Sequence, residues 1–276
     1  MPNDSRFAVL IDADNVSVRY IKLILDEISK DGIATYKRIY GDWTNPALVS
    51  WKSALLDNSV IPIQQYSYTT GKNATDSAMI IDAMDILYSG QVDGFCLVSS
   101  DSDFTRLAAR LRESGMTVVG MGERKTPNSF IAACNKFKYL DILSAAGEEE
   151  PEEPARKAPA PKGKKAAARK APAKSAKKEE PKEEPREELR EEPKTSLSPR
   201  SIKRALRSIV RENSDEDDWI IVGKVGNILL KRYPDFDVRN FGFSKLTPFL
   251  DSLDMFEIKS ERKDNSASPQ MYVRLK

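Results

Sequence analysis

Ala8-Val9-Leu10-Ile11-Asp12-Ala13-Asp14-Asn15 is an apolar run that ends in two carboxylates and an amide. Continuous apolar residues of this kind predict a buried parallel strand. Polar side chains at the carboxyl end of such a strand lie at the mouth of an open α/β sheet, where this class of fold binds its ligands. We therefore expect a doubly wound, mostly parallel sheet with a functional site at the end of its first strand.

A second stretch has the same design, since Phe95-Cys96-Leu97-Val98-Ser99-Ser100-Asp101-Ser102-Asp103-Phe104 passes from apolar residues to two aspartates. If the two strands are neighbours, their ends bring several carboxylates together. Asp76 lies in the first turn of a helix expected over 75–88, where the helix dipole favours an anion. The candidate site therefore combines four acidic groups from three segments, Asp12, Asp76, Asp101 and Asp103, with Asn15 and Asp14 close by.

The sequence contains no histidine. This excludes Ser-His-Asp and Cys-His nucleophiles and nearly all catalytic zinc sites. Hydrolysis would depend on carboxylates that hold hard divalent cations, such as Mg²⁺ or Mn²⁺. Two such cations about 4 Å apart activate a water and stabilise the attacking and leaving oxygens at a phosphodiester. Basic residues near the site are candidates to neutralise substrate phosphates: Lys72, Arg106, Arg124 and Lys125.

The composition also indicates the setting of the protein. No apolar run approaches membrane-spanning length, and the N-terminus enters a strand without the apolar core of a signal peptide. We expect a soluble, cytoplasmic protein with no membrane partner. Cys96 and Cys134 lack metal-ligand spacing and are expected to be buried free thiols.

The chain divides into three parts, at 5–145, 146–196 and 197–276. Apolar periodicity in the first part predicts alternating strands and helices. Besides the two stretches quoted above, strands are expected at 34–40, 60–64 and 116–121, and helices at 16–30, 46–56, 75–88, 103–114 and 129–134, with a short last element at 140–143. The helix over 75–88 is apolar on most faces and should be largely buried.

The middle part is rich in Lys, Glu, Pro and Ala, and Leu189 is its only large apolar residue. It cannot bury enough apolar surface to offset the entropy of ordering, so we expect a disordered linker. A solubilising tether is the simplest interpretation of this linker. Its lysines would also attract nucleic-acid phosphates without sequence preference.

The third part predicts a small winged helix-turn-helix α+β domain. Helices are expected over 201–210, from Trp219 through 225–230, and over 241–253, followed by hairpin strands at 256–258 and 271–273.

Three motifs in the first part resemble the NYN domain, a branch of the PIN-like ribonucleases. They are Leu10-Ile11-Asp12-Ala13-Asp14-Asn15-Val16, Lys72-Asn73-Ala74-Thr75-Asp76 with Asp82 downstream, and Ser99-Ser100-Asp101-Ser102-Asp103-Phe104. The resemblance covers about residues 5–143 and implies a PIN-like (Rossmann-like) fold. It also implies that Asp12, Asp76, Asp101 and Asp103 are catalytic and metal-binding, with Asn15 as the polar partner of Asp12. Ser100 is a mild departure, because glycine is common there in relatives.

The third part resembles the OST-HTH (LOTUS) domain. The matching residues are Asp218-Trp219, Val222-Gly223-Lys224-Val225-Gly226, Tyr233-Pro234-Asp235-Phe236-Asp237 and Phe241-Gly242-Phe243-Ser244-Lys245-Leu246. The resemblance implies RNA binding or the docking of a protein partner. By charge alone, the candidate RNA contacts are Lys224, Arg239, Lys245 and Arg274.

The leading hypothesis is a Mg²⁺- or Mn²⁺-dependent endoribonuclease whose third part binds or orients RNA. A catalytically inactive RNA-binding or regulatory scaffold protein is the alternative. A phosphohydrolase of the haloacid-dehalogenase type ranks third. There Asp12 would be the nucleophile and Asp14 the general acid, but Asp76 would have no role.

Overall fold

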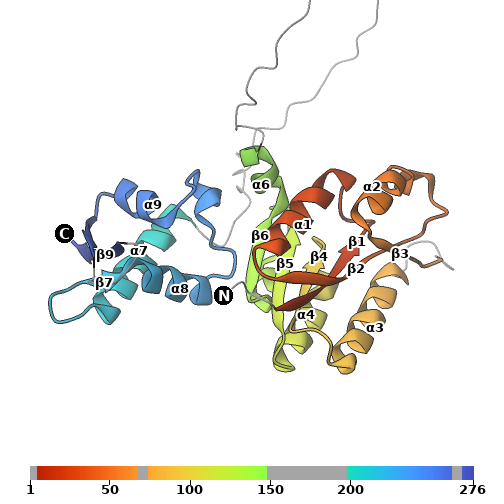
Figure 1. Ribbon diagram of the computed structural model, residues 1–276, viewed down its shortest axis with the longest axis horizontal. Coiled ribbons are helices and arrows are strands. Elements are labelled where there is room, and N and C mark those ends of the chain that lie inside the picture. The colour runs from red at the N-terminus through yellow and green to blue at the C-terminus, as the bar shows by residue number, and fades with distance from the viewer. Residues whose placement is uncertain (1–4, 67–73, 148–197, 263–268) are drawn as a thin grey trace, which may run out of the picture.

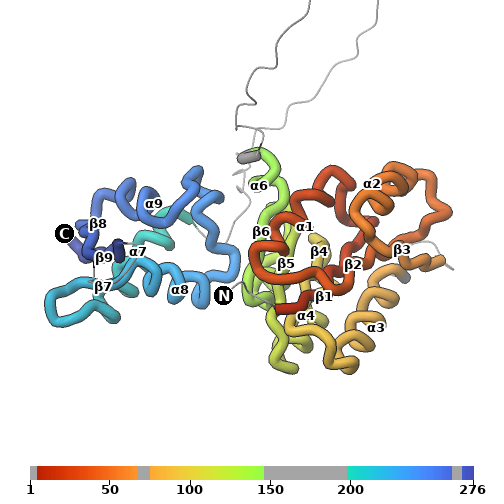
Figure 2. The backbone as a smooth tube through the Cα atoms, viewed as in Figure 1, coloured from red at the N-terminus to blue at the C-terminus, as the bar shows by residue number. Residues whose placement is uncertain are grey.

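The computed structural model describes residues 5–66, 74–147, 198–262 and 269–276. These residues form two bodies, a larger one at the N-terminal end of the chain and a smaller one at the C-terminal end (Figure 1). The backbone trace in Figure 2 follows the chain through the first body, in red to green, and through the second, in teal to blue. The expected linker lies almost entirely outside the described residues, and so does Lys72.

The first body contains a six-stranded sheet in which all pairs of neighbouring strands are parallel, in the order β3-β2-β1-β4-β5-β6. Its strands are β1 (Arg6–Asp12), β2 (Ile33–Gly41), β3 (Ile61–Gln64), β4 (Gly94–Val98), β5 (Thr117–Gly122) and β6 (Lys136–Tyr139). Its helices are α1 (Ile21–Ser29), α2 (Trp51–Asn58), α3 (Ala74–Ser89), α4 (Thr105–Glu113), α5 (Asn128–Ala133) and α6 (Leu140–Gly147). Short 3-10 turns precede three of them: η1 (Val18–Tyr20), η2 (Pro46–Leu48) and η3 (Ser102–Phe104).

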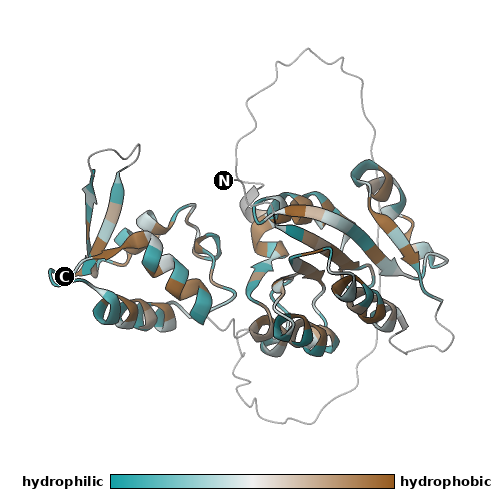
Figure 3. Cartoon of the chain, turned by 60° about the horizontal axis from the view of Figure 1, so that its bottom comes forward, coloured by the Kyte–Doolittle hydropathy of each residue, from teal (hydrophilic) through white to brown (hydrophobic). Residues whose placement is uncertain are grey.

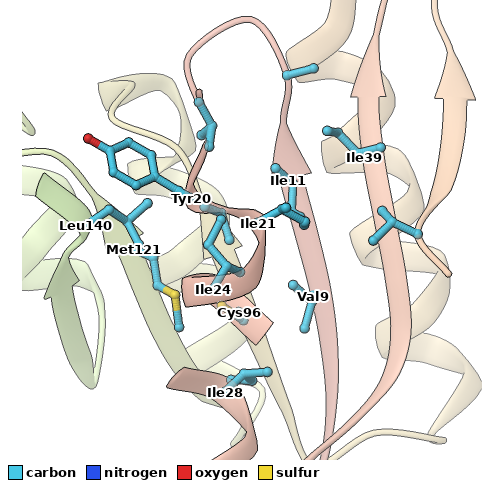
Figure 4. Packing of buried hydrophobic residues seen from close by; sticks show 14 of the residues in the cluster. Val9, Ile11, Tyr20, Ile21, Ile24, Ile28, Ile39, Cys96, Met121 and Leu140 are labelled. Carbon is cyan, nitrogen blue, oxygen red and sulfur yellow. The ribbon is translucent and has the colours of Figure 1, made fainter. Parts of the chain in front are cut away.

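Helices cover both faces of the sheet, which gives three layers (Figure 1). One apolar core lies between the sheet and α1, α2 and α6, and Figure 4 shows Ile24 of α1 in this core with Val9 and Ile11 of β1. The second core lies between the other face of the sheet and α3, α4 and α5, and it includes Ala8 and Leu10. Successive residues of a strand point to opposite faces, so β1 contributes to both cores.

The structure confirms the mostly parallel α/β fold and differs from the expectations in several details, among them the short strand at Ile220–Ile221 where a helix was expected to begin. A strand, β6, was missed, because it has four residues and alternates with lysines. The helix over 75–88 is not buried on most faces, since Ile81 and Tyr88 are 63% and 74% exposed. The helix expected over 241–253 is shorter and is α9 (Leu246–Ser252). The residues before it form a 3-10 turn that ends at Gly242, which has the left-handed αL conformation.

The second body is the expected small α+β domain. α7 (Pro199–Asn213) begins at Ser198, whose side chain accepts a hydrogen bond from the Ser201 N–H. The remaining elements are β7 (Ile220–Ile221), α8 (Val222–Arg232), η4 (Val238–Phe241), α9, β8 (Phe256–Glu261) and β9 (Gln270–Leu275). The antiparallel sheet β7-β9-β8 and the helices enclose one core, and each helix carries both hydrophobic and hydrophilic residues (Figure 3).

The two bodies contact each other through polar groups. The Phe137 N–H of β6 donates to the Pro234 carbonyl at 2.7 Å, and the Tyr139 hydroxyl donates to the buried Asp235 carboxylate at 3.0 Å. Arg239 donates to both carboxylate oxygens of Glu27, at 2.7 and 3.0 Å. This bidentate geometry is the strong form of the Arg–carboxylate pair. The second body is therefore held at the free edge of β6.

Glu27 is only 1% exposed, so its charge depends on these contacts. Burial alone would raise its pKa, but hydrogen bonds from Arg239 and Lys30 and the charge of Lys138 outweigh burial and hold the pKa well below its usual value. A carboxyl with a lowered pKa contributes stability above its unfolded pKa and loses that contribution as the pH falls through the folded value. The contact is therefore fully formed at neutral pH.

Arg239→Ala is expected to weaken the contact between the two bodies by about 1–3 kcal/mol, because Glu27 loses its bidentate partner. Small-angle X-ray scattering should then show a larger radius of gyration, while circular dichroism shows unchanged secondary structure. Arg274→Ala is the matched control, because Arg274 pairs with Glu257 inside the second body. Identical scattering from the two variants would contradict the role of Arg239.

Candidate active site

The strand order places the candidate residues at one point of the sheet. β1 pairs with β2 on one side and with β4 on the other, so the order of connection reverses between β1 and β4. In open α/β sheets, ligands bind in the crevice at the carboxyl ends of the strands beside such a reversal. Asp12 ends β1, and Asp101 follows the end of β4. Sequence patterning and topology therefore indicate the same location.

Asp12 is fully buried, and its carboxylate accepts three hydrogen bonds. The donors are the Asp14 N–H at 3.0 Å, the Asn15 side-chain amide at 2.7 Å and the Ser99 hydroxyl at 2.8 Å. Burial raises the pKa of Asp12 in spite of these bonds, which favour the charged form. Asn15 is thus the polar partner of Asp12, as expected.

A chain of hydrogen bonds connects Asp12 to the aspartates after β4. Ser99 donates to Asp12 and accepts from the Asp101 N–H at 3.1 Å, and Asp101 in turn accepts from the Asp103 N–H at 3.0 Å. Asp101 is the N-cap of η3, which fixes the direction of its side chain. The local turn after β4 therefore positions both aspartates relative to β1.

The first turn of α3 adds the third acidic segment. Asp76 is 9% exposed, and its neighbour Thr75 donates a hydrogen bond to the Asp14 carboxylate at 2.9 Å. Carboxylate oxygens of Asp76, Asp101 and Asp103 all lie within 4.8 Å of one another. Asp12 lies outside this triad but is the first of the charged groups that act on Asp76.

The triad accumulates negative charge. The pKa of Asp76 is raised to about 6, first by burial and then by the charges of Asp12, Asp101, Asp103 and Asp14. Among the described residues, neither Asp76 nor Asp101 forms an ion pair with a lysine or arginine. Oxygen-only donors, the burial of Asp76 and the repulsion that raises its pKa together fit a hard divalent cation held by Asp76, Asp101 and Asp103.

Other candidates have different surroundings. Asp82 pairs with Arg38 and accepts from Tyr40, so it stabilises the packing of α3 on β2. Arg106 is exposed in the first turn of α4, directly after η3. Arg124 and Lys125 follow β5 at the same sheet edge and remain more than half exposed while they pair with Asp141 and Glu123.

The candidate RNA contacts of the second body also divide into two groups. Lys224 and Lys245 are exposed, with no ion pair among the described residues. Arg239 instead pairs with Glu27 and Asp237, and Arg274 pairs with Glu257 and lies over the Trp219 ring. Both arginines already have acidic partners in the structure, and their assignment as RNA contacts stays a prediction from charge.

Two residues at the site were not singled out from the sequence. Ser99 links Asp12 to Asp101, and Thr75 links α3 to Asp14. Gly122 permits a close approach here, because a Cβ on it would lie 2.6 Å from the Ser99 carbonyl oxygen. The signal for Ser99 was present, since it is the first polar residue after a buried strand.

Comparison with known protein families identifies both domains. Residues 6–141 match the model of the NYN domain, and residues 179–266 match that of the OST-HTH/LOTUS domain. The chain therefore contains a PIN-like NYN domain followed by an OST-HTH/LOTUS domain. These two domain types support a ribonuclease-like, RNA-associated role, and PIN-like NYN nucleases generally use divalent metals.

Two solved structures with similarity to the chain are described as proteins without a known function. A protein of unknown function, VPA0982 from Vibrio parahaemolyticus, is 19% identical, with 50% of this chain and 93% of that chain covered and a TM-score of 0.43. An uncharacterized protein from gene locus NE0665 of Nitrosomonas europaea is 27% identical, with 35% and 91% covered and a TM-score of 0.26. No curated protein matches the chain. Within the described ranges, none of the helices has the length and apolar character needed to cross a membrane.

Asp76→Asn is expected to stabilise the metal-free protein by about 1–3 kcal/mol above pH 6, because it removes a charged form that burial and repulsion disfavour. The native pKa of about 6 exceeds the ordinary value of 3.8. Wild-type stability therefore falls as the pH rises between these values, and the variant should not show this loss. Melting temperatures measured in EDTA at about pH 5 and pH 8 test this.

Mn²⁺ supplies the control for this prediction. The ion should raise the melting temperature of the wild type at about pH 8 and have a smaller effect on Asp76→Asn, because metal binding requires the deprotonated ligand. Equal melting temperatures for wild type and variant at both pH values would contradict the charge repulsion assigned to Asp76.

Proposed function

We propose that the protein is a metal-dependent ribonuclease that cleaves RNA phosphodiester bonds at the carboxylate triad. The observation that carries the proposal is the convergence of Asp76, Asp101 and Asp103, from two separate segments, within 4.8 Å beside the buried Asp12. Neither Asp76 nor Asp101 has a lysine or arginine partner in the described chain, and burial together with the neighbouring carboxylates disfavours the charged form of Asp76.

Each residue has a distinct role in this proposal. Asp76, Asp101 and Asp103 hold Mg²⁺ or Mn²⁺. Asp12 is oriented by Asn15 and Ser99 and supplies a fourth negative charge beside the metal ligands. A bound divalent cation lowers the pKa of water and stabilises charge on phosphodiester oxygens. Arg106, Arg124 and Lys125 neutralise phosphates of the RNA strand near the site, and Lys72 is proposed for the same role from its position in the sequence.

The decisive experiment measures cleavage of labelled single-stranded RNA by wild type and Asp101→Asn in Mg²⁺, Mn²⁺ or EDTA. Wild type should cleave only with metal, and Asp101→Asn should be about 100-fold slower or less active still, because one ligand loses its charge. Cleavage of circular RNA, which has no ends, identifies endonucleolytic action.

Asp85→Asn is the matched control, because Asp85 is an exposed carboxylate on α3, outside the triad. It should retain wild-type activity. Equal activity of Asp101→Asn and wild type would contradict the proposal. RNA binding without metal-dependent cleavage by any variant would instead support the inactive RNA-binding scaffold.

A further inference from the structure

One face of α7 carries a strong and unbalanced positive charge. The helix has five basic residues and one acidic residue, Glu212, which pairs with Arg232 and accepts from Ser208. The basic residues are all exposed, and none of them forms an ion pair with another described residue: Arg200, Lys203, Arg204, Arg207 and Arg211. We call these five residues the α7 stripe.

The α7 stripe is narrow and continuous. At about 100° per residue, its five positions fall within an arc of about 100°, and they extend over about 16 Å of helix. The buried residues of α7, such as Ile202, Leu206 and Ile209, point the other way into the core. The stripe lines a shallow groove of about 660 Å³.

This arrangement does not favour the stability of the helix. Like charges three or four positions apart repel, as at Arg200 and Arg204 or Arg207 and Arg211. Arg200 also lies in the first turn, where the positive end of the helix dipole disfavours a cation. An ordinary solvated face would alternate the two signs of charge. The excess of cations therefore calls for an anionic partner.

Contact between the two bodies brings the start of the stripe to the nuclease domain. Pro199, the first residue of α7, and Arg124, which follows β5, line the same cavity of about 220 Å³ together with Tyr139 and Asp235. Arg124 lies near the carboxyl end of β5, beside β4 and its aspartates, because the Glu123 N–H donates to the Ser100 hydroxyl at 2.9 Å. Neighbouring strands are about 5 Å apart, so this position is within a few nucleotides of the triad.

We infer that the α7 stripe binds the phosphate backbone of the RNA strand whose scissile bond lies at the carboxylate triad, with Arg124 between the two sites. The inference rests on the proposed function for its substrate and assigns a binding surface other than Lys224 and Lys245. Four of its five cations are arginines, which bind phosphate in bidentate fashion. An RNA strand bound along the α7 stripe would offset the repulsion among its five cations.

Charge also allows a second occupant, the glutamate-rich stretch of this chain that precedes α7 in the sequence. RNA is favoured because its charges are uniform and closely spaced, whereas that stretch intersperses its glutamates with lysine, arginine and proline. The two occupants predict different results, because removal of cations weakens RNA binding only if RNA occupies the stripe.

The test compares three double substitutions, each of which removes two positive charges from the second body of the full-length Asp101→Asn protein. The first, Arg204→Gln/Arg207→Gln, changes the α7 stripe. The second, Lys224→Gln/Lys245→Gln, changes the two exposed lysines that the sequence predicts to contact RNA. The third, Lys231→Gln/Arg262→Gln, is the control. Fluorescence anisotropy measures binding of a long single-stranded RNA in EDTA over a range of salt concentrations, so that no cleavage occurs.

The stripe variant should bind most weakly, and the slope of log K against log salt should fall by about 1.4, which is about 0.7 for each RNA phosphate that the variant no longer neutralises. Equal weakening in all three variants would show binding by net charge and overturn the inference. A larger weakening in Lys224→Gln/Lys245→Gln, or unchanged or tighter binding by the stripe variant, would also overturn it.

Cleavage assays separate this inference from the proposed function. In the catalytically intact protein, the stripe substitutions should raise KM for long RNA more than for an oligonucleotide too short to reach α7. If the wild type fails to cleave but the stripe variant still loses RNA affinity, the nuclease proposal falls and the binding surface stands. If cleavage occurs and the length of the RNA has no influence on the effect, the binding surface falls.

Discussion

The buried carboxylate of Asp12 is the centre on which the site depends. It accepts hydrogen bonds from Asn15 and Ser99, and Ser99 also holds the backbone of Asp101. A carboxylate buried at the end of a central strand is tolerated only if its oxygens accept hydrogen bonds. The bonds that satisfy Asp12 also couple the end of β1 to the turn after β4, so the geometry of one strand end depends on the other.

Several carboxylates lie close together around Asp12 in spite of the repulsion among their charges. Two apolar cores, one on each side of the sheet, hold the strand ends in place while the pKa of Asp76 rises to about 6. Functional sites commonly keep such unfavourable arrangements, which are stabilised by the rest of the fold. The same principle applies to the α7 stripe, where an apolar face anchors a helix whose exposed face repels itself.

Local features of the sequence predicted the fold class and the position of the acidic groups. The apolar runs before Asp12 and Asp101 are continuous, so their strands and their exposed ends were recognisable. β6 was missed because its pattern is short and contains Lys138, whose charge is satisfied by Glu27 and Asp31 far away in the sequence. The partner of Arg239, Glu27, was hidden for the same reason. Charge alone does not indicate whether a partner from another element already binds it.

The hydrogen bond between β6 and Pro234 has a consequence for the solubility of the chain. Edge strands with free backbone groups can pair with other molecules. β3 limits this through its short length and Pro62, which has no N–H to donate. At the other edge, the second body covers β6 and occupies the Phe137 N–H. The C-terminal domain therefore also closes an open side of the sheet, and separation of the two bodies would expose a surface suited to self-association.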